Sequence, residues 1–107
     1  MTEIRLTLQI PQEHPSYAGH FPGQPIVPGV VLLDEVLRAA EALPHWPGAP
    51  DGPLEIPVCK FVQAVLPGAT LALVLSAGHS AGTLNFQLQQ DGRPVASGSL
   101  RRTGTAP

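Results

Sequence analysis

The chain opens with a strict alternation of apolar and polar residues. Every second residue from 4 to 10 is Ile or Leu, and the residues between them are Arg, Thr and Gln. A period of two is typical of a β-strand with one buried face. Pro11 ends the pattern, and five prolines between residues 11 and 28 exclude regular structure over most of that stretch.

After Gly29 the pattern changes to VVLLDEVLRAAEAL, which is rich in good helix-forming residues. Pro28 stands where a helix start tolerates proline, and Pro44 closes the segment, so we expect a helix over about 29–42.

The first two turns of this helix are apolar around most of their circumference, which predicts a buried helix. Asp34 lies four residues after Val30 and shares its face. Glu35 turns further round, onto the side of Arg38, which we expect to be the more solvated side.

Four more strand-like runs fill the second half of the chain, at residues 54–65, 70–76, 84–89 and 95–101. Pro57 inside the first of them suggests an edge strand or a bulge. Asp91-Gly92 is a strong signal for a tight hairpin between the last two runs.

One apolar helix and a five-stranded antiparallel sheet pack well in one way, with the sheet curled around the helix. The pattern therefore predicts a single α+β domain over residues 1–107. The second face and the edges of such a sheet favour association with another subunit.

Composition narrows the choice of partners. Only 13% of the residues are charged and the net charge is −2, so neither nucleic acid nor a membrane is an expected partner. Cys59 is the single cysteine, which excludes an internal disulfide and a multi-thiolate zinc site. The N-terminus has no apolar block, so the cytoplasm is the expected compartment.

The chemistry is concentrated in one segment, HFPGQPIVPGVVLLDE, which runs from His20 to Glu35. An imidazole precedes a turn built from prolines and glycines, and a helix with a carboxylate one turn inside its start follows. A base, an acid and a helix N-terminus are what an enzyme needs to remove a proton beside a carbonyl and expel a hydroxyl.

This segment resembles that of the β-hydroxyacyl-acyl-carrier-protein dehydratases of bacterial fatty-acid synthesis, which have the hotdog fold. The similarity rests on His20-Phe21-Pro22-Gly23, Pro25, Pro28-Gly29-Val30 and a carboxylate fourteen residues after the histidine. Cys59-Lys60-Phe61 with Leu66-Pro67-Gly68, and Asp91-Gly92 with Val95-Ala96, are compatible with the rest of the family pattern.

The resemblance implies roles for individual residues. His20 would be the catalytic histidine, Asp34 the catalytic carboxylate, and Gly29 the residue whose backbone N–H holds the thioester carbonyl. Phe21, with Pro28 and Val30, would contact the substrate, and Tyr17 would join Phe21 in lining the acyl tunnel. Glu35 stands next to Asp34, so the choice of acid between the two is open.

The chemistry of these residue types favours the same roles independently of the resemblance. Imidazole titrates near neutral pH and suits removal of the C2 proton of a 3-hydroxyacyl thioester. A carboxyl group buried on an apolar helix is expected to hold a proton that it can donate to the leaving hydroxyl. The Gly29 N–H and the positive end of the helix dipole would meet charge on the thioester oxygen.

The expected function is thus dehydration of a 3-hydroxyacyl thioester, on acyl carrier protein or coenzyme A, in fatty-acid or polyene and polyketide-type biosynthesis. No cofactor and no metal are expected. The resemblance also implies a homodimer or higher oligomer, with the histidine of one subunit facing the carboxylate of the other. Two alternatives stay open: a hotdog acyl thioesterase, and a non-catalytic acyl-binding partner of a synthase complex.

Overall fold

The computed structural model describes residues 3–17, 26–43, 54–78 and 82–102. They form five strands, one α-helix and a short 3-10 helix. In chain order these elements are β1 (Ile4–Gln9), η1 (Pro15–Tyr17), α1 (Gly29–Glu41), β2 (Leu54–Phe61), β3 (Thr70–Ala77), β4 (Thr83–Gln90) and β5 (Arg93–Arg102). Each strand and the helix expected from the hydrophobic pattern is present.

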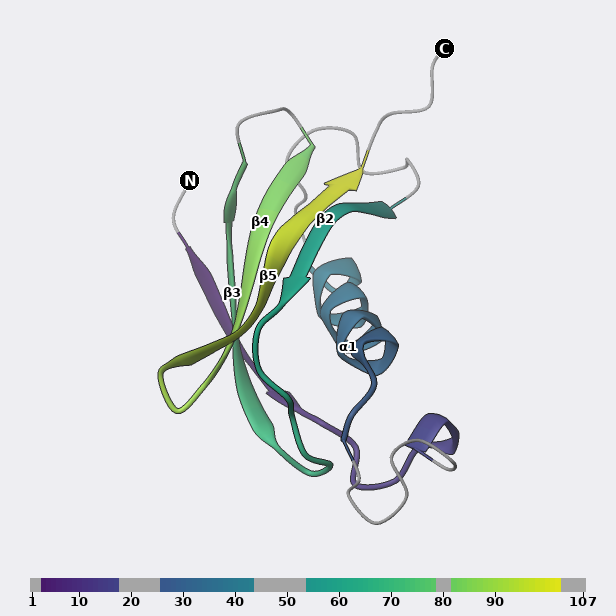
Figure 1. Cartoon of the computed structure of the whole chain (residues 1–107). Coiled ribbons are helices and arrows are strands. Elements are labelled where there is room, and N and C mark those ends of the chain that lie inside the picture. Colours follow the sequence, from purple (N-terminus) through teal and green to yellow (C-terminus); the bar gives the residue numbers. More distant parts are fainter. Residues whose placement is uncertain (1–2, 18–25, 44–53, 79–81, 103–107) are drawn as a thin grey trace.

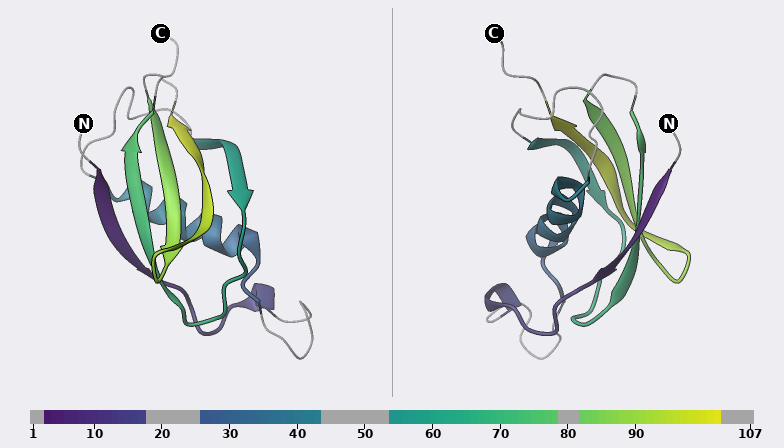
Figure 2. Two further views of the ribbon diagram at one scale, coloured as in Figure 1. Left: turned by 60° about the vertical axis from the view of Figure 1, so that its left-hand side comes forward. Right: turned by 180° about the vertical axis from the view of Figure 1, so that it is seen from behind.

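The strands form one antiparallel sheet in the order β1-β3-β4-β5-β2, so β1 and β2 are its edges. The sheet is strongly curved, and α1 lies against its concave face (Figures 1 and 2). This is the hotdog arrangement that the sequence predicted.

Local irregularities in the sheet follow the sequence signals. The pairing of β2 with β5 shifts register between Glu55 and Val58, where Pro57 interrupts the strand, so the expected edge and bulge are both confirmed. Asp91 and Gly92 have φ angles of 52° and 79°, the backbone of the tight hairpin predicted between β4 and β5.

The core lies between the concave face and α1. Alternate residues of the central strands point into it and are almost fully buried; they include Leu71, Leu73, Leu75, Leu84, Phe86, Leu88 and Leu100. In β4 the residues between them are polar and lie on the convex face, as the period of two predicted, whereas β3 has the buried, apolar Val74 at such a position. An ion pair between Arg102 and Glu41, 2.7 Å long, joins the end of β5 to the end of α1.

The helix departs from the expectation of burial around most of its first turns. Its buried face consists of Val31, Leu32, Val36 and Ala40. Val30 is 68% exposed, because at 100° per residue it lies on the side away from the sheet. One sheet covers one side of a helix, so the apolar residues of the other side stay uncovered in a single chain.

Close packing between β5 and the edge strand β2 depends on Gly98 of β5. A Cβ at this position would lie 2.8 Å from a ring carbon of Phe86 and 3.0 Å from Cα of Cys59, and it would collide with the carbonyl oxygen of Val58. Two of these three obstacles are backbone atoms of β2, which cannot move without breaking the β2–β5 pairing.

We therefore expect Gly98→Ala to lower the free energy of unfolding by about 1–3 kcal/mol, the usual cost of overpacking. Urea unfolding followed by circular dichroism measures the change. Ser97→Ala is the matched control, since Ser97 is exposed on the neighbouring position of the same strand. Equal unfolding midpoints for the two variants would show that β2 yields to the extra methyl group.

Candidate active site

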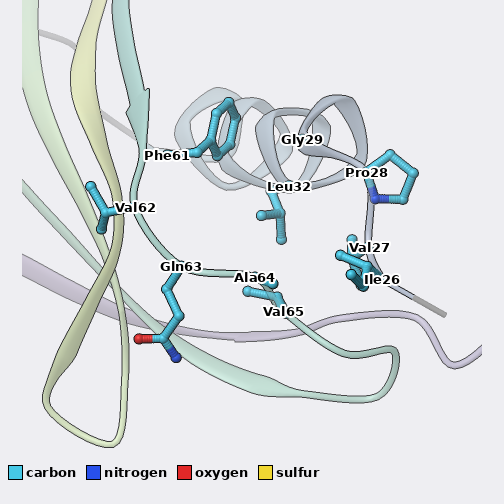
Figure 3. Close-up of a pocket in the computed structure, with 10 residues that line it drawn as sticks. All are labelled: Ile26, Val27, Pro28, Gly29, Leu32, Phe61, Val62, Gln63, Ala64 and Val65. Carbon is cyan, nitrogen blue, oxygen red and sulfur yellow. The ribbon is translucent and has the colours of Figure 1, made fainter. Parts of the chain in front are cut away.

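An open, largely apolar pocket lies at the N-terminal end of α1. Its volume is about 470 Å³, within the range of pockets that bind small molecules. Three segments form its walls: the residues that lead into α1, the first turn of α1, and the end of β2 with the connection that follows it (Figure 3). The lining residues are Ile26, Val27, Pro28, Gly29, Leu32, Phe61, Val62, Gln63, Ala64 and Val65.

Backbone hydrogen bonds hold these walls together. The Val27 N–H donates to the Val65 carbonyl at 2.8 Å, which fixes the entry to α1 against the β2–β3 connection. The Val62 N–H donates to the Val95 carbonyl at 2.9 Å, so the connection is also tied to β5. β2 therefore ends at Phe61. Residues 62–65, which we expected to continue the strand, leave the sheet and line the pocket.

Gly29 is the first residue of α1, and its backbone lines the pocket. Pro28 caps the helix in an extended conformation without a side-chain hydrogen bond. The first N–H groups of a helix have no acceptor within the helix and carry the positive end of its dipole. The pocket is therefore bordered by the N-terminal end of α1, where the helix dipole favours negative charge.

The ring of Phe61 covers Gly29. A Cβ at position 29 would lie 2.9 Å from Cζ of Phe61 and 3.1 Å from Cε2, so a side chain there would displace the ring. From the sequence we expected a substrate against this glycine and overlooked Phe61. The available signal was its place at the end of a run with apolar residues on both faces.

Asp34 does not lie in a buried environment within its own chain, which corrects the expectation for its side chain. The side chain is 51% exposed, and its carboxylate forms an ion pair with Arg38 at 3.1 Å, one turn further along the helix. Val30, Asp34 and Arg38 share the helix side that faces away from the sheet, so desolvation of Asp34 requires another molecule.

Glu35, expected on the solvated side with Arg38, lies instead at the flank of the helix and is half-buried. Burial, and to a lesser extent the negative charge of Glu35, raise the pKa of the Tyr17 phenol above its ordinary value. The Tyr17 hydroxyl stays protonated and donates to the Pro11 carbonyl at 2.9 Å. Glu35 is thus close enough to Tyr17 to influence the pKa of the phenol, and Tyr17 lies outside the lining of the described pocket.

Four predicted site residues remain, of which two belong to the described part of the chain and two do not. Pro28 lines the pocket beside Gly29, whereas Val30 is outside the lining and exposed. His20 and Phe21 lie outside the described residues. Within the described ranges, no three His, Cys, Asp or Glu side chains gather as metal ligands, and no helix there is long and apolar enough to cross a membrane.

Curated proteins similar in sequence to this chain are 3-hydroxyacyl-[acyl-carrier-protein] dehydratases. The chain is 35% identical over 94 residues to the 3-hydroxyacyl-[acyl-carrier-protein] dehydratase FabZ of Thermus thermophilus, covering 80% of this chain and 66% of the relative. It is 32% identical over 91 residues to the FabZ of Enterococcus faecalis, covering 78% and 64%. The chain thus spans slightly less than two thirds of the length of these curated relatives.

Solved structures share the fold. The dehydratase heterocomplex ApeI:P from Xenorhabdus doucetiae matches with a TM-score of 0.70 and 29% identity, over 92% of this chain and 85% of that one. The fluoroacetyl-CoA thioesterase FlK matches over 95% of this chain and 84% of that one, with a TM-score of 0.56. At 16% identity, the second likeness concerns the fold alone.

The family model described as ApeI dehydratase matches residues 1–99, nearly the whole chain. The match includes α1, the pocket at its start and the segment with His20. The protein therefore belongs to the ApeI-like dehydratase family.

Proposed function

We propose that this protein is a hydro-lyase that removes water from 3-hydroxyacyl thioesters on acyl carrier protein to give trans-2-enoyl thioesters. The observation that carries the proposal is the apolar pocket at the start of α1, which contains the Gly29 backbone. An acyl thioester needs this combination, because its chain is apolar and its carbonyl oxygen gains negative charge in the reaction.

In the proposed mechanism His20, as neutral imidazole, removes the proton from C2 of the substrate. The negative charge that develops on the thioester oxygen is stabilised by the Gly29 N–H and by the helix dipole. Asp34, in its protonated form, donates a proton to the C3 hydroxyl group, which leaves as water. The electron pair of the broken C2–H bond forms the new double bond.

We further propose that the active unit is a homodimer in which His20 of one subunit meets Asp34 of the other. Its support is the position of Asp34 on the uncovered side of α1, next to the exposed Val30. A second subunit over this side of the helix would remove water from Asp34 and replace Arg38 as its neighbour.

His20→Ala and Asp34→Asn are each expected to lower kcat by about 10²–10⁴-fold, the usual contribution of a positioned acid or base. The assay follows the enoyl absorbance during dehydration of 3-hydroxybutyryl thioesters on carrier protein and on coenzyme A. Glu35→Gln is the matched control, since it removes the adjacent carboxylate, and it should keep most of the activity.

A loss of activity in Glu35→Gln but not in Asp34→Asn would make Glu35 the acid and overturn the assignment. Release of free acid and thiol instead of enoyl product would indicate a thioesterase. Binding of the acyl carrier without turnover would indicate the non-catalytic alternative.

Mixing the two inactive variants tests the shared site. In a heterodimer of His20→Ala with Asp34→Asn, one site combines both substitutions and the other has neither. Random exchange of subunits should therefore restore about one quarter of the wild-type activity, as expected for a two-fold dimer. Folding and dimer formation are checked by circular dichroism and light scattering. An inactive mixture of exchanged, folded dimers would place both groups in the same chain.

A further inference from the structure

We propose that Phe61 determines substrate specificity at C2, the carbon next to the thioester carbonyl, by excluding acyl groups that carry a substituent there. This inference rests on the proposed function and adds a residue to it.

The geometry starts from the contact between Phe61 and Gly29. Three atoms at the tip of the ring, Cζ, Cε2 and Cε1, lie 2.9, 3.1 and 3.4 Å from the position of a Cβ on Gly29. The ring therefore fills the space directly beside the backbone to which we assign the thioester oxygen. Figure 3 shows the ring next to the first turn of α1, on the wall opposite Ile26 and Val27.

A carbonyl group bound to the Gly29 N–H has its C2 atom one bond beyond the carbonyl carbon, and this atom then lies within reach of the ring. An unbranched C2 presents only hydrogens to the ring, and a methyl group needs the space that the ring occupies. Leu32 and Val65 line the same pocket further inside, where the remainder of the chain would extend.

The position of Phe61 in the sheet makes it suitable for this role. It is the last residue of edge strand β2, paired with Ala96 of β5, and its side chain is on the helix side of the sheet. Phe61 is 44% exposed, whereas Phe86 on β4 is 1% exposed. The ring thus contributes to the pocket wall more than to the core, and its replacement should alter the pocket more than the stability.

The experiment compares kcat/KM for two pantetheine thioesters, 3-hydroxybutyryl and 2-methyl-3-hydroxybutyryl, in variants of the full chain. The wild type should favour the unbranched substrate. Phe61→Ala should reduce this preference by about tenfold or more, the usual worth of one carbon group in an apolar pocket. Phe61→Trp should increase it. The ratio of two kcat/KM values does not depend on the fraction of folded enzyme, and Phe61→Leu serves if the alanine variant does not fold.

Phe86→Leu is the matched control: it shortens the other described phenylalanine on the same side of the sheet, outside the pocket, and should lower Tm without changing the ratio. Equal preference in the wild type and the Phe61 variants would overturn the role of Phe61. Absence of enoyl product from the unbranched substrate with the wild type would instead contradict the proposed function.

Discussion

The burial of one side of α1 against the concave sheet is the constraint on which the rest of the structure depends. Val31, Leu32 and Val36 are almost fully buried there, and each contributes roughly 1.5–3 kcal/mol to folding. With this side fixed, the rotation of the helix determines the direction of every other residue on it. Asp34 lies on the exposed side, Glu35 is half-buried at the flank, and Gly29 at the start of the helix lines the pocket formed with the β2–β3 connection.

Much of this fold was predictable because its signals are local. Alternation along β1, β3 and β4, the Pro57 irregularity and the Asp91-Gly92 turn each depend on a few neighbouring residues. The rotation of α1 was less accessible, because its first two turns are apolar on several sides. Sequence alone does not tell which of those sides the sheet covers, and for this reason the side of Glu35 was predicted incorrectly, while Asp34 is half-exposed within the single chain.

The residues of the candidate site likewise differ in how far the sequence could identify them. Gly29 could be identified from the sequence, since a glycine between Pro28 and an apolar helix weakens the helix start unless something must approach its backbone closely. Phe61 was harder to identify, because it is 32 residues away in sequence and reaches Gly29 only through the curvature of the sheet. Two groups therefore explain why position 29 is a glycine: the Phe61 ring that lies against it, and the thioester that we propose binds beside it.

The two edge strands of the sheet differ in the side chains that they expose. Along β1 the outward residues are polar, and Arg5 forms an ion pair with Glu3 at 3.6 Å. Along β2 the apolar Val58 is 60% exposed. A sheet in which both edge strands can pair with further copies can add them without limit and grow into a filament. In the homodimer that we propose, a contact through β2 would leave β1 with its polar residues at each outer end, which disfavours further growth of the sheet.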